Sequence, residues 1–106
     1  MARVFIVQEN DRFVFTNAEK FGTIVYLQGF YQIEDEGQAE TAADHMAAKL
    51  EDFNSEIDYL LLVGDPILIS IASALISHTT EGIYSVLKWD RQTRSYKAIL
   101  IDIGAV

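Results

Sequence analysis

The sequence predicts an α/β fold: one small domain with a mixed, mostly parallel sheet of about five strands, two helices and a C-terminal β-hairpin. The first observation is the stretch 58–76, where the apolar run 60–63 is followed by Gly-Asp-Pro and a second apolar run. The second is the alternation of strand-like and helix-like segments, which is typical of parallel or mixed sheets covered by helices. The third is a pair of strand-like segments, 83–89 and 96–103, joined by a short polar turn.

The stretch 58–76 has the pattern of a buried strand, a tight turn and a helix. A short apolar run bounded by turn residues is typical of a strand buried on both faces. Asp65 suits the position before a helix because its carboxylate accepts bonds from free N–H groups, and Pro66 suits the first helical position. We therefore expect strand 60–63 inside the sheet, followed by a right-handed crossover.

The segments before this unit contain two further strands. Residues 2–8 and 23–27 are rich in Val, Ile and other strand-forming residues, and they predict the first two strands. Residues 13–15 form either a short strand or an apolar loop. Thr16 and Glu19 have the spacing of a capping box, which predicts a single helical turn between the two strands.

Residues 38–53 predict the first helix, because apolar residues recur there at steps of three and four. The face expected to be buried is Ala43, Met46, Ala47, Leu50 and Phe53.

The second predicted helix, from Pro66 to about Ser77, is apolar nearly all round. Either the rest of the chain encloses this helix, or a second copy covers it. We expect a homodimer or a higher oligomer, the dimer being the commonest assembly. The residues expected to carry this self-association are Ile67, Leu68, Ile71 and Leu75.

Composition limits the class of protein. A chain of 106 residues is one domain, 1–106, and its lack of Cys excludes disulfides and thiolate chemistry. The net charge of −8 argues against general nucleic-acid binding. The apolar run 4–7 is too short for a signal peptide, and no segment is long enough to span a membrane. We expect a cytoplasmic protein.

The charges are unevenly distributed. Residues 34–58 contain nine carboxylates and one Lys, which predicts either a solvated helix face or an imitation of a nucleic-acid backbone that engages a basic protein. The predicted hairpin instead concentrates basic and aromatic side chains, the types common at interface hot spots. This expected partner surface consists of Lys88, Trp89, Arg91, Arg94, Tyr96 and Lys97. In the other interpretation, Trp89 packs in the core and the charges protect an edge strand.

Two other groups of residues have weaker functional interpretations. Gly64-Asp65-Pro66 lies where α/β sheets bind ligands, and a small-ligand or nucleotide site there is the alternative function. The segment lacks a glycine-rich phosphate-binding motif, so a simple helix start is favoured. His45 and His78 have no second His or Cys beside them in the sequence. We therefore expect no catalytic residues, no metal and no cofactor.

Three segments of the chain resemble a group of small proteins encoded by tailed bacteriophages and prophages. They are Phe21-Gly22 with the strand after it, DYLLLVGDP at 58–66, and LKWDRQTRSYKAILID at 87–102. The last is the most specific. The resemblance implies a phage origin and carries over no catalytic residue. Together with the composition, it predicts a non-enzymatic accessory protein that binds itself and another macromolecule, either a host or a phage protein.

Overall fold

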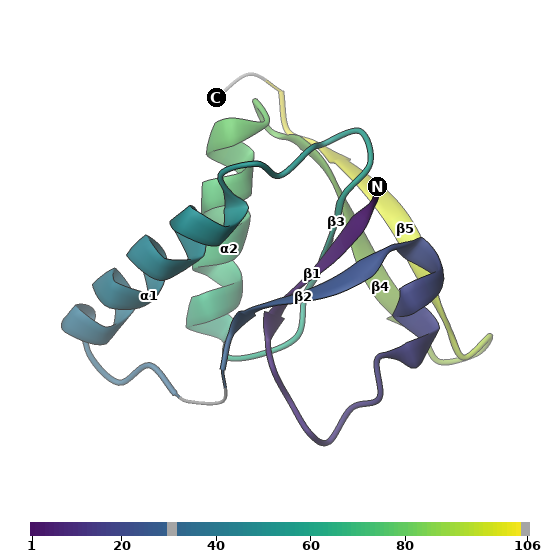
Figure 1. The fold of residues 1–106 in the computed structure, drawn as a ribbon, viewed down its shortest axis with the longest axis horizontal. Coiled ribbons are helices and arrows are strands. Elements are labelled where there is room, and N and C mark those ends of the chain that lie inside the picture. The colour runs from purple at the N-terminus through teal and green to yellow at the C-terminus, as the bar shows by residue number, and fades with distance from the viewer. Residues whose placement is uncertain (30–31, 105–106) are drawn as a thin grey trace.

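The computed structural model describes residues 1–29 and 32–104, and these form a five-stranded sheet in the order β2-β1-β3-β4-β5 (Figure 1). The strands are β1 (Arg3–Gln8), β2 (Thr23–Gln28), β3 (Tyr59–Leu61), β4 (Ile83–Asp90) and β5 (Ser95–Asp102). Neighbouring strands are parallel except β4 and β5, which pair antiparallel. The structure confirms the mixed, mostly parallel sheet, the central position of β3 and the hairpin at one edge.

The two faces of the sheet are covered differently. The helices α1 (Glu36–Leu50) and α2 (Pro66–Thr79) lie side by side on one face, which we call the helical face (Figure 1). Its core includes Phe5, Leu60 and Val86. Among the described residues, those that cover the other face, which we call the open face, come from 15–21, and its core includes Val4, Ile6 and Leu61. The 3-10 helix η1 (Thr16–Phe21) lies on this open face.

β2 lies on one side of β1 in the sheet, and the later strands β3, β4 and β5 lie on the other side. The chain passes from β1 to β2 over the open face, and then from β2 through β3 to β4 over the helical face. Because direction and face change together, the three crossovers have the same hand, as the preference for right-handed crossovers requires. The order 2-1-3-4-5 is common in doubly wound sheets, whose topological switch point lies between β1 and β3.

Carboxylates begin both long helices, and the prediction for Asp65 is confirmed. Its Oδ1 accepts a hydrogen bond from the Ile67 N–H at 2.8 Å, and Pro66 occupies the first turn. Asp35 caps α1 in the same way, accepting from the Gln38 N–H at 2.8 Å.

The first helix differs from its prediction in its end and in its buried face. It ends at Leu50, because the chain turns there and the Phe53 N–H donates to the Leu50 carbonyl at 3.0 Å. The Phe53 ring then packs against Phe5, with 5.5 Å between ring centroids. The residues that α1 buries fully are Ala42, Met46 and Leu50. Ala43 is half-buried, whereas Ala47 is exposed, so the prediction is wrong for Ala47.

One local prediction on the open face is wrong, and one alternative that the sequence left open there is decided. The capping box at Thr16 and Glu19 is absent: η1 is preceded by Phe15, which makes no side-chain cap. Phe15 is buried, and its carbonyl accepts from the Ala18 N–H at 2.9 Å, so Thr16 already lies inside the turn. Residues 13–15 form a loop, not a strand.

The central strand is shorter than predicted. β3 ends at Leu61 because the Val63 N–H bonds back to the Leu61 carbonyl at 3.0 Å. The Val63 carbonyl accepts from the Gln8 N–H at 3.0 Å, which holds the turn against the end of β1. Leu62 is left on the surface, 40% exposed.

Asp58 anchors the start of β3 at the amino edge of the sheet. Its side chain is fully buried and accepts hydrogen bonds at 2.9 Å from the Arg3 N–H, the Arg3 Nη2 and the Asn54 N–H. Arg3 also reaches Asp52 at 3.0 Å. These contacts raise the pKa of Arg3, chiefly through the hydrogen bond to Asp58. Asp52 and Asp58, like the helix cap Asp35, therefore have structural roles within the acidic segment 34–58.

Candidate binding surface around Trp89

The β4–β5 hairpin places Trp89 on the open face at the surface of the molecule. Its side chain is 41% exposed, so it does not belong to the core. The ring meets Tyr96 edge to face, with centroids 5.0 Å apart and planes at 67°. Tyr96 is buried, and burial raises its pKa. The buried Tyr96 ring therefore supports the Trp89 side chain and keeps it at the surface.

The basic residues of the hairpin divide into two groups. Lys97 Nζ lies 2.8 Å from Asp90 Oδ2. The pKa of Asp90 is lowered to about 2, chiefly by this hydrogen bond and also by the Gln92 N–H. Lys88, Arg91 and Arg94 are exposed, and no ion pair joins them to another described residue. These three residues present positive charge to solvent, while Lys97 is engaged within the hairpin.

Two hollows flank Trp89. One has a volume of about 390 Å³ and is lined by Arg12, Phe13, Val14, Thr16, Asn17, Val63 and Trp89. The other, of about 340 Å³, is lined by Leu61, Leu62, Val63, Val86, Leu87, Lys88, Trp89, Tyr96 and Ile99. Trp89 and Val63 line both hollows, and no carboxylate among the described residues lines either. We call the residues of the two hollows, with Arg91 and Arg94, the Trp89 surface.

The loop after β1 contributes residues that the sequence did not assign to a site. Phe13 is 55% exposed and Val14 is 76% exposed, and both line the larger hollow with Trp89. In the sequence, Phe13 and Val14 belong to a short apolar run that lies outside the predicted strands and helices. Such residues have no core of their own to enter, so exposure beside another apolar group is the expected outcome.

The larger hollow lies at the carboxyl edge of the parallel strands. Residues 12–17 follow β1, Val63 follows β3, and Trp89 lies near the end of β4. In open α/β sheets, ligands bind outside the carboxyl ends of the strands at the switch point, which here lies between β1 and β3. The Trp89 surface thus includes the edge where this architecture most often binds other molecules.

The turn at Gly64 is packed against the chain itself. A Cβ at Gly64 would lie 2.5 Å from the Cβ of Gln8, and its φ of +137° favours glycine. The Gln8 Oε1 accepts from the Asp65 N–H at 2.8 Å. The Asp65 carboxylate accepts from the N–H groups of Ile67 and Ile33, at 2.8 and 3.3 Å. Internal packing therefore accounts for the Gly64-Asp65 pair.

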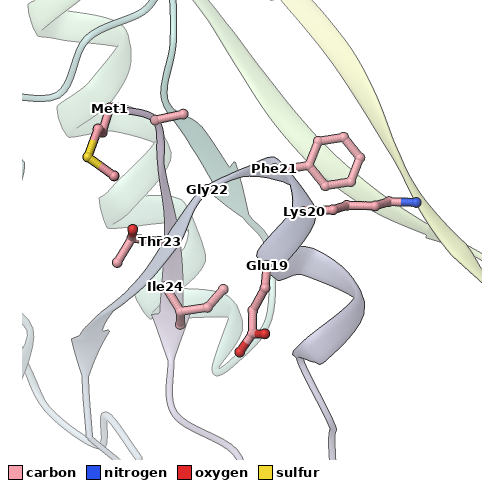
Figure 2. A pocket seen from close by; sticks show the side chains of 8 residues that line it. Met1, Glu19, Lys20, Phe21, Gly22, Thr23 and Ile24 are labelled. Atoms are coloured by element: carbon pink, nitrogen blue, oxygen red, sulfur yellow. The ribbon is translucent and has the colours of Figure 1, made fainter.

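A third hollow, of about 560 Å³, lies at the opposite, amino edge of β1 and β2 and is shown in Figure 2. Its side chains diverge: Phe21 and Lys20 extend to one side and Met1 to the other (Figure 2). Gly22 lets the backbone approach Ala2, where the Thr23 N–H donates to the Ala2 carbonyl at 3.1 Å. The converging polar groups typical of a ligand site are absent from the residues that line this hollow.

The residues expected to carry self-association on α2 lie in different environments. Leu68 is fully buried against the sheet and has no surface to offer a second copy, so that assignment is corrected. Ile71 and Leu75 are partly buried against the core of the helical face. Ile67 is 46% exposed. For these last three residues, self-association stays a prediction.

The described residues contain no group of three or more His, Asp or Glu side chains able to hold a metal ion. Nδ1 of His45 lies 3.3 Å from Nε2 of Gln28. Within the same part of the chain, no helix has both the length and the apolar character needed to cross a membrane.

The fold and this surface define a small α/β protein with an exposed aromatic and basic surface at the carboxyl edge of its sheet. A family profile described as Phage Pam3 gp32-like protein matches residues 2–103, and the chain belongs to that family of phage proteins. The resemblance to phage proteins read from the sequence is thereby confirmed. Comparison with curated proteins and with solved structures finds no match.

Proposed function

We propose that this phage protein is a non-enzymatic accessory protein of the host cytoplasm, and that it associates with itself and binds another macromolecule through the Trp89 surface. The observation that carries the proposal is Trp89 itself. A large aromatic ring is held in an exposed position by Tyr96, between two hollows. An exposed ring that lines two hollows can serve as an anchor for an incoming side chain, because aromatic residues dominate interface hot spots.

Charge favours an acidic protein segment as the occupant. The whole chain carries a net charge of −8, yet Arg12 and Lys88 line the two hollows. Arg91 and Arg94 extend from the adjoining turn. Complementary charge orients encounter and raises the association rate. We therefore infer a phage or host protein that inserts an apolar side chain beside Trp89 and places carboxylates against these basic residues.

The first test replaces the anchor. Trp89→Ala should weaken capture of the partner from lysate of infected cells by roughly thirtyfold or more, since a hot-spot residue contributes about 2 kcal/mol or more. Ile57→Ala is a matched control, because Ile57 is also 41% exposed and does not line either hollow. Circular dichroism of each variant checks the fold. Equal capture by the Trp89 and Ile57 variants would contradict the proposal.

The second test separates the basic hairpin from the acidic segment. We expect Arg91→Glu with Arg94→Glu to keep the fold and abolish capture. The comparison variant neutralises Glu34, Glu36 and Glu40, all exposed, and spares the helix cap Asp35. If the acidic variant loses the partner while the arginine variant keeps it, then imitation of a nucleic-acid backbone replaces the hairpin proposal.

The alternative function is binding of a small ligand or nucleotide at the switch point. The larger hollow supports it, because its volume of about 390 Å³ falls within the range of ligand pockets. The packing of Gln8 against Gly64 counts against the turn itself as the site. A nucleotide that raises the melting temperature of the wild type in a dose-dependent way, but not that of Trp89→Ala, would favour this alternative over a macromolecular partner.

A further inference from the structure

We propose that a second copy of this chain pairs antiparallel with the outer edge of β5, so that the two five-stranded sheets become continuous across a two-fold axis. This inference concerns the self-association that forms part of the proposed function, and it names a different surface from α2. Ile99 of this edge also lines the smaller hollow of the Trp89 surface. Dimerisation is therefore tested through molecular mass alone, and partner binding through capture by the Trp89 variant, so failure of one is distinguishable from failure of the other.

The outer edge of β5 is long, apolar and exposed. β5 is the outermost strand and is eight residues long. An edge strand presents a row of unpaired N–H and C=O groups, and a long, apolar, exposed edge is a template for another strand. Ile99 is 43% exposed and Leu100 is 64% exposed. Ile99 is paired with Val86 on the helical face and Leu100 with Ser85 on the open face, so both faces of this edge are apolar.

The outer edge of β5 lacks the usual protection against strand pairing. Lys side chains commonly protect edge strands from pairing. The Lys of β5 is Lys97, and Asp90 of the neighbouring strand holds its Nζ at 2.8 Å. No backbone hydrogen bond joins the outer edge of β5 to any other described segment; the Ile103 N–H, just after the strand, bonds to Gly82.

The opposite edge of the sheet is protected. At β2, Lys49 of α1 donates from its Nζ to the Tyr26 carbonyl at 2.9 Å, and α1 packs against this strand. A sheet with one protected and one open edge adds a single copy and then has no open edge left. Two-fold pairing therefore closes as a dimer, whereas two open edges would permit filaments.

The side chains of β5 are compatible with those of a second β5 strand paired antiparallel to it. A two-fold axis perpendicular to the sheet keeps each face continuous, so residues that meet must lie on the same face. With Ile99 opposite the partner's Ile99, Leu100 meets the partner's Ala98 and Lys97 meets the partner's Ile101. Asp102 then meets the partner's Tyr96. In this register no charged side chain of β5 faces a like charge. The two exposed Ile99 side chains, one from each copy, pack against each other at the centre.

The experiment measures mass by light scattering at micromolar concentration. We expect the wild type at twice the monomer mass. Ile99→Lys with Leu100→Lys should raise the dimer dissociation constant by at least about a hundredfold, since burial of unpaired charges is costly. Ile67→Lys is the matched control on α2, because Ile67 is 46% exposed, close to the 43% of Ile99. This control should stay dimeric.

A second measurement does not depend on the lysine variants folding. The chain has no Cys, so Ile99→Cys introduces a unique thiol. Opposed residues of antiparallel strands have Cα atoms about 4.5–5.5 Å apart, within the range that a disulfide spans. Mild oxidation should cross-link Ile99→Cys into a covalent dimer and leave Ile67→Cys monomeric. A monomeric wild type, or cross-linking through residue 67 instead of 99, would overturn the proposal.

Discussion

Asp58 offers the sharpest test of what holds the fold together. Its buried carboxylate accepts three hydrogen bonds at 2.9 Å, two from Arg3 and one from the Asn54 N–H. The Arg3 side chain is 28% exposed and keeps Asp52 as a second partner. Asp58→Ala removes the acceptor of the backbone N–H groups of Arg3 and Asn54. It also removes the buried partner of the Arg3 guanidinium, whose side chain is mostly covered.

The expected cost follows from these contacts. Removing one partner of a buried ion pair lowers the free energy of unfolding by about 3–5 kcal/mol. Because Arg3 retains Asp52 and some contact with water, we expect the lower part of that range, about 3 kcal/mol. For a domain of this size, each kcal/mol lowers the melting temperature by roughly 4–8 °C, so the transition should fall by roughly 12–24 °C.

Urea denaturation followed by circular dichroism measures the change in the free energy of unfolding. Asp52→Ala is the control: Asp52 is 70% exposed, and an exposed ion pair contributes less than about 1 kcal/mol. A loss of under about 1 kcal/mol for Asp58→Ala would refute the reasoning, because it would mean that water or a shifted backbone satisfies all three donors.

Three further predictions concern the two turns. Asp65→Ala should cost about 1 kcal/mol, the usual contribution of a helix cap, and should leave partner capture unchanged. Gly64→Ala should cost about 1–3 kcal/mol, measured by urea denaturation, because it combines a strained φ with a clash against Gln8. The stability that Asp90 gains from Lys97 should be fully present above pH 3.8 and be lost as the pH falls toward about 2, since its pKa is lowered in the folded state. In an NMR titration, Lys97→Gln should return the pKa of Asp90 toward its ordinary value.

Local signals explain which parts of the fold were predictable. The unit of β3, Asp65-Pro66 and α2 is encoded within twenty-one consecutive residues, and each signal there agrees with the next. The hairpin is equally local. In contrast, α2 is apolar nearly all round, so its sequence does not show which side faces the sheet. Leu68 was therefore assigned to the surface although the sheet covers it.

The candidate site was predicted only in the part that lies on one hairpin. Trp89, Lys88, Arg91 and Arg94 are close in sequence, and their composition alone marked them. The other wall of the larger hollow comes from Phe13 and Val14, more than seventy residues earlier in the sequence. Only the strand order, which sets β1 beside β3 and β3 beside β4, brings that loop to Trp89. No local pattern contains that information.

The position of β1 in the sheet has a consequence for synthesis of the chain. β1 is made first, yet it pairs with β3 through residues 55 positions later in the sequence. During translation, its four buried apolar residues, 4–7, therefore lack that partner until more than half of the chain has been made. Long-range pairings form slowly, whereas a local hairpin such as β4–β5 forms within microseconds. The chain is thus most prone to aggregate during translation, while β1 has been made and β3 has not.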